Sequence, residues 1–353
     1  MRRGAPALLL VLAAGCAAAR PSVVLVTIDG TRWQEIFAGA DPGLLEKEKE
    51  TGEIPAARKA FWRESAQERR RALAPFLWDT VAREGQLIGN VDRGSQILVT
   101  NRYRISYPGY HELLSGFASE TIDSNRQVPN PDVTVLEWLE RRPGFRGSVA
   151  AFCSWDLFPS ILNRERCGFP IDIGESPPMG SLLGRLAGEL PPPWHGSIYD
   201  AFVFHAALDY LREKTPRVLY VAFGDTDEWA HAGAYDHYLE AIHREDGWLA
   251  ELWRTLQSMP RYRGQTTLLV TCDHGRGDNP AQWRSHNMKV NGAGYVWAAA
   301  IGPGIPPGGE WSEHEPLLQG QMAATVAWAV GEDFAGENPK AAPPFPVRTI
   351  SRP

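Results

Sequence analysis

The chain has 353 residues, of which 43% are hydrophobic and 22% charged, and this is the composition of a soluble globular protein with a sizeable core. Its 36 Lys and Arg residues against 42 Asp and Glu residues give a formal net charge of −6, and the basic residues form no long run. A positive surface for binding a nucleic-acid duplex is therefore not expected. The length permits one large domain or two of ordinary size.

The first 20 residues have the pattern of an export signal. Met1–Arg3 carries positive charge, and Ala5–Ala14 is apolar but too short to span a bilayer. Ala13–Cys16 resembles a bacterial lipobox, although Ala13 is smaller than the usual residue, and Cys16 would then carry the lipid anchor. Cleavage at Ala17–Ala19 would instead release a free periplasmic protein. We expect an exported protein, periplasmic or membrane-anchored through Cys16, with no later segment that spans a membrane.

Apolar strand-like runs alternate with amphipathic segments through residues 21–353. Strands are expected at Ser22–Ile28, within Gln86–Thr100, and at Ser148–Phe152, Val218–Gly224, Gln265–Val270 and Tyr295–Ile301. Helices are expected at Ala74–Gly85, just after Pro108, and at Asp132–Arg141, Ile198–Arg212, Tyr235–Gln257 and Leu317–Val330. Residues 40–72 are interpreted as a charged surface insertion, and residues 174–193 as a Pro- and Gly-rich loop. Since no repeat interrupts this alternation, we predict a single α/β domain with a mostly parallel sheet.

Three cysteines follow the signal. Cys153 and Cys167 could form a disulfide in an oxidising compartment, or all three could be buried thiols. Cys272 lies at the end of an expected strand, so we interpret it as a core residue and not as a metal ligand.

Acidic and imidazole side chains follow three of the expected strands. Asp29 follows the first, and Asp273 and His274 follow the strand at 265–270. Asp227 and His231 follow the strand at 218–224 and, at i and i+4, would share one face of a helical turn. Taken singly, each has an ordinary explanation as a cap or a loop residue. Together they predict a metal site, because open α/β sheets bind ligands at the carboxyl ends of their strands.

Ser106 precedes a Pro-Gly turn and the start of a helix, where the helix dipole favours an anion. This placement suits a nucleophile, although an ordinary helix cap has the same pattern. His286, in the segment Arg284–Asn287, is a further candidate ligand. His237 and His243 are interpreted as residues on a helix surface.

The order of these motifs resembles the alkaline phosphatase superfamily, particularly its nucleotide pyrophosphatase/phosphodiesterase branch, from about Val23 to Val330. Five motifs are shared. The first is a strand that ends in Asp-Gly, and the second is a hydroxyl residue that precedes a Pro and then a helix with the pattern Leu-x-Ser-Gly. The other three are Asp-x-x-x-His, Asp-His-Gly and a His late in the chain. The resemblance implies a three-layer α/β/α sandwich and a hydrolase of phosphoric esters that acts on a small-molecule phosphoester.

The resemblance also implies a site with two divalent metal ions, zinc or alternatively manganese. One ion would be bound by Asp29, Ser106, Asp273 and His274, and the other by Asp227, His231 and His286. Ser106 would be the metal-bound nucleophile that forms a phospho-enzyme, and Asn125 would contact a phosphoryl oxygen. Asp225 competes with Asp227 for the second ion, and we favour Asp227 because it alone has a His at i+4.

Several alternatives remain open at this stage. Sulfatases of the superfamily need an Arg where this chain has Tyr110, which counts against that activity. A phosphotransferase or mutase would need a larger cap than the insertion at 40–72. A non-catalytic surface lipoprotein would not need the Asp and His residues that could bind metal ions. No basic residue is evident in the segment 154–158, where some monoesterases have one, so the choice between monoesters and diesters stays open.

Overall fold

The structure, a computed structural model, describes residues 20–47, 54–174, 186, 189–190 and 194–346. The expected export signal, with Cys16, lies outside these residues, as does most of the loop at 174–193.

The strands are β1 (Ser22–Ile28), β2 (Gln86–Ile88), β3 (Ile97–Leu98), β4 (Val149–Cys153), β5 (Ile171–Asp172), β6 (Val218–Phe223), β7 (Thr266–Thr271), β8 (Tyr295–Val296), β9 (Ala298–Ile301), β10 (Gly309–Glu310) and β11 (Leu317–Leu318). The helices are α1 (Trp33–Ala38), α2 (Pro42–Lys47), α3 (Ile54–Phe61), α4 (Ala66–Leu73), the π-helix η1 (Leu77–Val81), α5 (Ala82–Glu84), the 3₁₀-helix η2 (Val91–Arg93), α6 (Ser106–Ser115), α7 (Val135–Glu140), α8 (Phe158–Ile161), α9 (Arg164–Cys167), α11 (Asp200–Lys214), α12 (Asp225–Ala232), α13 (Tyr235–Ser258), α14 (Gln321–Ala329) and α15 (Phe334–Glu337).

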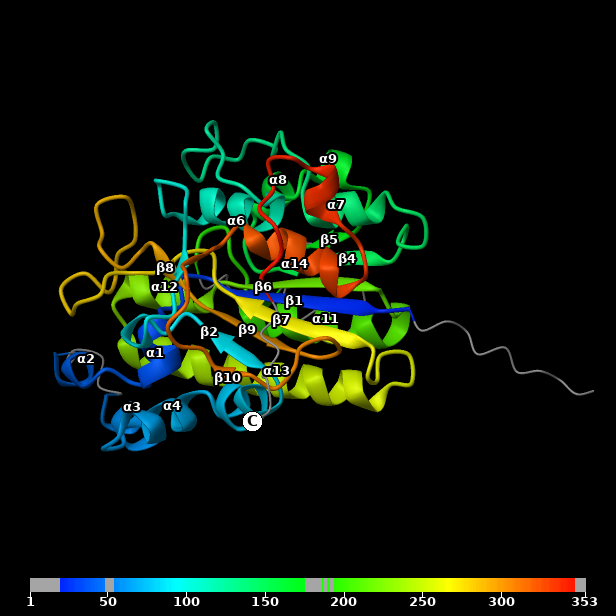
Figure 1. Ribbon diagram of the computed structural model, residues 1–353. Helices are drawn as coiled ribbons and strands as arrows, with labels where there is room; N and C mark the ends of the chain where they lie inside the picture. Colours follow the sequence, from blue (N-terminus) through cyan, green and yellow to red (C-terminus); the bar gives the residue numbers. More distant parts are fainter. Residues whose placement is uncertain (1–19, 48–53, 175–185, 187–188, 191–193, 347–353) are drawn as a thin grey trace, which may run out of the picture.

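An eight-stranded sheet forms the centre of the fold, with the strand order β10-β2-β9-β7-β1-β6-β4-β5 (Figure 1). Strands β7, β1, β6, β4 and β5 run parallel, and β9 is antiparallel to both of its neighbours. A smaller sheet has the order β11-β3-β8. These pairings confirm the predicted α/β class with a mostly parallel central sheet.

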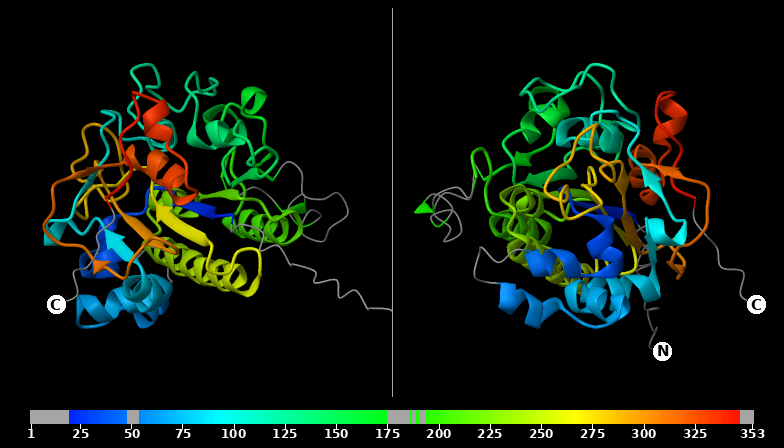
Figure 2. Two further views of the ribbon diagram at one scale, coloured as in Figure 1. Left: turned by 45° about the vertical axis from the view of Figure 1, so that its right-hand side comes forward. Right: turned by 90° about the vertical axis from the view of Figure 1, so that its left-hand side faces the viewer.

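Helices cover both faces of this sheet. α14 contacts β1 and α7 contacts β4, while α11 contacts β4 and β6. Helices α6, α7 and α14 lie on one side of the sheet and the long helix α13 lies on the other (Figures 1 and 2). The result is the three-layer arrangement that was expected, with one layer of strands between two layers of helices.

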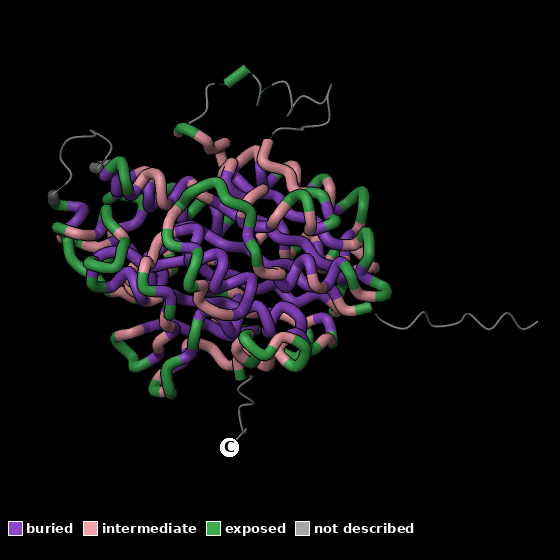
Figure 3. The backbone as a smooth tube through the Cα atoms, turned by 90° about the horizontal axis from the view of Figure 1, so that it is seen from above, coloured by how far each residue is buried: buried purple, intermediate pink, exposed green. Residues whose placement is uncertain are grey.

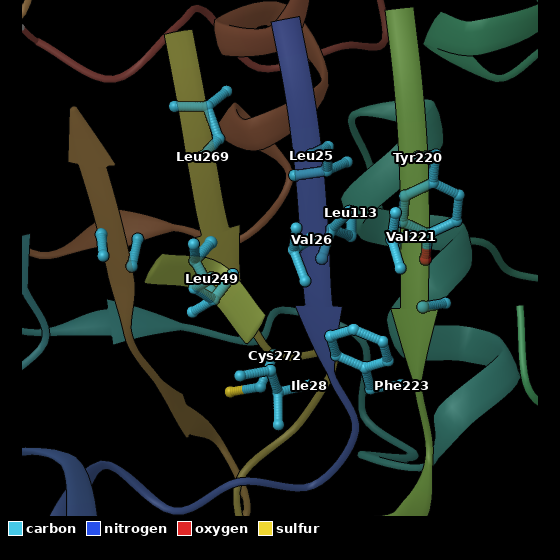
Figure 4. Packing of buried hydrophobic residues seen from close by; sticks show 14 of the residues in the cluster. Leu25, Val26, Ile28, Leu113, Tyr220, Val221, Phe223, Leu249, Leu269 and Cys272 are labelled. Carbon is cyan, nitrogen blue, oxygen red and sulfur yellow. The ribbon is translucent and has the colours of Figure 1, made fainter. Parts of the chain in front are cut away.

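The central strands are apolar along their whole length because both of their faces are covered. Every residue of β1, β6 and β7 is buried. Figure 4 shows Leu25, Val26 and Val221 with the ring of Tyr220 among these strands, and Leu113 of α6 beside them. Buried segments occupy the middle of the fold and exposed loops its edge (Figure 3). This packing fixes the positions of the strand ends, and the candidate site residues follow directly after these ends.

Some elements differ from the sequence-based expectation. The predicted helix at 74–85 is helical but contains the π-helix η1 before the short α5. The predicted helix at 317–330 is wrong at its start, because Leu317–Leu318 pairs with β3 and α14 begins only at Gln321. The described residues of the segment at 40–72 form α2, α3 and most of α4, and they bury Leu44 and Phe61 in the core.

Cys153, Cys167 and Cys272 are buried and unpaired thiols, so the structure does not contain the Cys153–Cys167 disulfide. Within the described part of the chain, no helix has both the length and the apolar character needed to cross a membrane.

Candidate metal centre

Three loops meet at the carboxyl edge of the central sheet. Asp29 follows β1, α12 begins directly after β6, and Asp273 lies two residues past β7. Strand β1 pairs with β6 on one side and with β7 on the other, so the three loops are neighbours. The order of the strands, and not the proximity of residues in sequence, therefore brings these side chains together.

The first group of side chains surrounds His274. Its Nε2 lies 3.5 Å from Asp29 Oδ1, 3.3 Å from Asp273 Oδ2 and 3.3 Å from Ser106 Oγ. Asp29, Asp273 and His274 together offer three ligand atoms close enough to hold one metal ion. These are the residues, with Ser106, that the resemblance assigned to the first ion.

The second group is centred on Asp227. His231 Nε2 lies 3.1 Å from Asp227 Oδ2 and 3.0 Å from His286 Nε2, and His286 Nε2 lies 3.7 Å from Asp227 Oδ1. His274 Nε2 is 4.0 Å from Asp227 Oδ1, and its ring stacks on that of His286 at 3.7 Å. His274 thus lies between the two groups. All seven predicted residues are in one place, and their roles as ligands remain predictions.

The imidazole rings of His274 and His286 are protonated on the nitrogen that leaves the other one free to bind a metal ion. His274 Nδ1 lies 3.1 Å from the carbonyl of Gly275, and His286 Nδ1 lies 3.1 Å from that of Arg104. Because a carbonyl only accepts hydrogen bonds, Nδ1 carries the proton in each ring and the Nε2 lone pair points into the group. Asp29 Oδ1 and Asp273 Oδ2 are buried without a hydrogen-bond partner. Both observations fit metal ligands.

The carboxylates of the first group destabilise each other's charge. Burial, and then the neighbouring Asp273 and Asp227, raise the pKa of Asp29 well above its ordinary value. Burial and the charge of Asp227 raise the pKa of Asp273 to about 8. Burial lowers the pKa of His286 to about 4, which keeps its ring neutral. A bound cation would offset the repulsion and hold both carboxylates in the ionised form.

Arg276 was not predicted from sequence, and it contacts the second group. Its buried guanidinium forms an ion pair with the Asp227 carboxylate and donates to the Asp227 carbonyl at 3.0 Å. Burial would raise the pKa of Asp227, but the charge of Arg276 more than offsets it, and this pKa lies well below its ordinary value. Asp225 is directed elsewhere, because its carboxylate accepts from Arg244 at 2.9 Å.

The two groups open onto a cavity of about 180 Å³. Ser106, the first residue of α6, lines it together with Tyr110, whose hydroxyl donates to Asp29 Oδ2 at 2.9 Å. Asn125 also lines the cavity, and its Oδ1 accepts from the Tyr107 backbone N–H at 2.9 Å. Its two amide N–H donors have no partner among the described residues and could bind a ligand. The cavity therefore places a hydroxyl and an amide beside the possible metal ligands.

The sheet topology and the Asp, His and Ser side chains at its edge define a hydrolase of the alkaline phosphatase superfamily, whose members are metal-dependent. A model of the type I phosphodiesterase / nucleotide pyrophosphatase family matches residues 41–293, and the chain belongs to this family. The matched segment begins after Asp29, which β1 nevertheless brings to Asp273 and His274.

Solved structures share the fold at low sequence identity. A protein in the alkaline phosphatase superfamily from Vibrio parahaemolyticus is 14% identical, with a TM-score of 0.53 over 89% of this chain and 67% of that one. The lipoteichoic acid synthase LtaP from Listeria monocytogenes is 12% identical, with a TM-score of 0.57 over 90% and 74%. The phosphonate monoester hydrolase of Agrobacterium radiobacter is 14% identical, with a TM-score of 0.54 over 88% and 74%. No curated protein matches the chain.

Proposed function

We propose that the chain is an exported, metal-dependent hydrolase of phosphoric esters in which Ser106 is the nucleophile. The observation that carries this proposal is the convergence of three carboxylates, three imidazoles and a serine hydroxyl at one cavity. Burying so many carboxylates together is costly unless cations compensate their charge. A binding module on the same scaffold would have no need of this arrangement.

The residues at the site fit two divalent ions. The first ion would be held by Asp29, Ser106, Asp273 and His274, and the second by Asp227, His231 and His286. Mixed carboxylate and imidazole ligands suit zinc, with manganese as the alternative. When bound, such ions supply Lewis-acid chemistry, which favours ionised serine and neutralises charge on the phosphoryl group.

The chain's own residues position the reacting groups. Ser106 Oγ attacks phosphorus, the Oγ–P bond forms as the bond to the leaving alcohol breaks, and water then cleaves the phospho-serine. Ser106 begins α6, whose N-terminal N–H groups and dipole favour an anionic phosphoryl group. The free amide donors of Asn125 would bind one phosphoryl oxygen, and Tyr110 orients the Asp29 carboxylate.

The lining of the cavity supports diesters over monoesters. Among the described residues that line it, none is Lys or Arg, and the segment 154–158 contributes Ser154, Trp155 and Phe158. A monoester dianion carries more charge than a diester monoanion, so a site without basic side chains suits the diester better. We therefore propose that the chain is a phosphodiesterase. The expected export signal at residues 1–20 supports a substrate outside the cytoplasm.

The decisive experiment is a substrate panel with wild-type protein and Ser106→Ala after addition of zinc or manganese. Wild-type protein should hydrolyse bis-p-nitrophenyl phosphate faster than p-nitrophenyl phosphate, and p-nitrophenyl sulfate least. Ser106→Ala should lose at least about a thousandfold in kcat, because the covalent step is gone. Its metal content, measured by mass spectrometry, should stay close to that of wild type. Full activity of this variant would remove Ser106 from the mechanism.

A further inference from the structure

The edge of the central sheet opposite the metal centre carries a set of basic side chains. Strands β7, β1, β6 and β4 are neighbours and run parallel, so their amino ends share this edge, and Figure 1 shows the starts of β1 and β7 on the side of the molecule away from α12. Each strand is preceded within five residues by arginine, namely Arg20 before β1, Arg146 before β4, Arg217 before β6, and Arg261 and Arg263 before β7. We call these five arginines and Lys214, the last residue of α11, the basic edge.

Hydrogen bonds between the loops hold three of these arginines close together. Arg261 Nη1 donates to the Arg20 carbonyl at 2.8 Å. Arg217 donates to the Pro21 carbonyl at 3.2 Å and to the Gly144 carbonyl at 3.0 Å. Burial, and then the charges of Arg261 and Arg20, lower the pKa of Arg217. Because the acceptors are neutral carbonyls, these hydrogen bonds fix the side chains without cancelling their positive charge.

The loops of the basic edge contain no acidic residue. Neither Asp nor Glu occurs in the segments 20–21, 141–148, 215–217 and 259–265.

Three acids lie near the basic edge. Glu332 attracts Arg217 but pairs with Arg142 at 2.6 Å, and Glu213 is an exposed acid beside Lys214. Glu140 lies near Arg146 and accepts from the Gly147 N–H at 2.7 Å. The basic edge therefore has a net positive charge, although the formal net charge of the chain is −6. Its members come from separate segments, which is why the sequence shows no basic run.

The amino-terminal end of the described chain lies at the basic edge. Arg20 is the first described residue, and Cys16, where a lipid anchor is expected, lies four residues before it. Four residues of extended chain span at most about 14 Å. An anchor at Cys16 would therefore hold the basic edge close to the bilayer surface. Basic side chains at this distance are attracted to anionic lipids, and a lipid chain with a basic patch is a common pair of membrane signals.

We propose that the basic edge docks on an anionic lipid bilayer, with the amino ends of the four strands toward the headgroups. The metal centre lies at the carboxyl ends of the same strands, and the seven residues of β1 separate the two edges by about 23 Å. The cavity consequently opens away from the bilayer and toward water. This docking is independent of the reaction that the site performs, so it goes beyond the proposed function.

The test measures the binding of residues 17–353, without export signal or lipid, to vesicles. All residues of the hydrophobic core lie at Val23 or later, so this chain retains the whole core. It should bind vesicles with about 30 mol% phosphatidylglycerol at least about tenfold more tightly than vesicles of phosphatidylcholine alone, because each basic side chain near an anionic surface contributes about fivefold. Raising the salt concentration to about 0.5 M should abolish this difference.

A double variant, Arg146→Gln with Lys214→Gln, removes two exposed charges from the basic edge. It should bind the anionic vesicles about tenfold or more weakly. The matched control, Lys59→Gln with Lys289→Gln, removes two exposed charges from α3 and from the loop that carries His286, and its affinity should stay within about twofold. Urea unfolding of both double variants should follow that of the unsubstituted chain, because all four side chains are exposed.

Equal binding to the two kinds of vesicle, or an equal loss of affinity in the two double variants, overturns the inference. Tighter binding to a short DNA duplex than to the anionic vesicles also overturns it and would assign the basic edge to a nucleic acid. None of these measurements depends on turnover, so the proposed function is tested separately.

Discussion

Asp225 and Asp227 are two residues apart on the same helix, yet their surroundings differ. Asp227 faces His231 and His286 at the cavity, whereas Asp225 pairs with Arg244 and accepts a hydrogen bond from the Asp200 backbone N–H. The i+4 spacing that favoured Asp227 in the sequence thus corresponds to a real contact with His231. Of the two, only Asp227 lies beside the imidazoles that are expected to bind the second ion.

Asp227→Asn should therefore reduce kcat/KM by roughly a hundredfold or more and reduce the number of metal ions bound per chain, because an amide is a much weaker ligand than a carboxylate. Asp225→Asn should cost about tenfold at most, since it perturbs α12 and no ligand. Steady-state kinetics and metal analysis on both variants measure the difference. If Asp225→Asn were the more damaging change, the second site would have to be reassigned.

Arg276 places a positive charge where the second ion is expected. Its guanidinium binds the Asp227 carboxylate from behind and is itself held by the Arg284 carbonyl at 2.6 Å. The side chain is buried and is not among the residues that line the cavity, so Arg276 contacts Asp227, the expected metal ligand, and not the space for a substrate. Repulsion between the guanidinium and a divalent ion weakens binding of that ion.

Arg276→Met keeps an unbranched apolar stem and removes the charge, so it should tighten binding of the metal ion at the second site by about tenfold or more. Titration of the metal-free protein with zinc, in competition with a chelator, measures both affinities. The zinc affinity of the first site should change much less. Arg284→Gln removes the same charge from an exposed neighbouring side chain and should leave both affinities as in wild type. An unchanged second affinity in Arg276→Met would show that the guanidinium does not oppose the ion.

At the scale of elements, the position of α6 relative to the Asp273 loop depends on a glycine. A Cβ at Gly109 would lie 2.4 Å from the backbone carbonyl oxygen of Asp273, and backbone at that distance cannot move aside cheaply. Gly109 therefore allows the helix that carries Ser106 to approach the loop that carries Asp273 and His274.

Gly109→Ala should force the helix and the loop apart and lower the free energy of unfolding by roughly 1–3 kcal/mol. Activity should fall further than the loss of folded protein explains, because Ser106 moves away from His274. Gly247→Ala is the matched control on α13, where a Cβ meets nothing within 4 Å. That variant should gain up to about 1 kcal/mol from helix propensity and keep full activity. Urea unfolding and steady-state rates of both variants test the contrast.

The long elements could be predicted because their sequence pattern and their burial agree. Strand β6 was expected at 218–224 and spans Val218–Phe223, a continuous buried run. The failures are local and depend on tertiary contacts. Leu317–Leu318 continues an apolar pattern that suits a helix, but pairing with Ile97–Leu98 makes it a strand. No local signal distinguishes those outcomes.

At the scale of the whole molecule, the position of the site could be predicted but its surroundings could not. Strand ends in a parallel sheet share one edge, so Asp29 and Asp273 were expected to meet, and Asp29 and Asp273 now lie beside the same His274 nitrogen. Arg276 acts through its contact with the Asp227 carboxylate, and a sequence pattern does not encode this contact. The division of ligands between two ions remains a prediction for the same reason.

Stability of the molecule should depend on Asp246, which lies on α13 and is not one of the candidate site residues. Its buried carboxyl accepts from the backbone N–H groups of Phe76 and Leu77 at 2.7 and 3.0 Å, at the start of η1. Burial raises the pKa of Asp246 to about 7, although these two hydrogen bonds lower it in part. In the unfolded chain the same pKa is about 3.9.

A pKa that is higher in the folded chain means that the folded chain holds the proton between about pH 4 and pH 7, while the unfolded chain has released it. The stabilisation is complete below about pH 4 and is lost as the pH rises through about 7.

Asp246→Asn cannot titrate, so its free energy of unfolding should rise relative to wild type by roughly 2–4 kcal/mol between about pH 4.5 and pH 8. Urea unfolding at both pH values measures this, with Asp209→Asn, an exposed acid on α11, as the control that should follow wild type. A constant difference between Asp246→Asn and wild type at the two pH values would show that Asp246 is ionised throughout and that the hydrogen bonds at η1 outweigh burial.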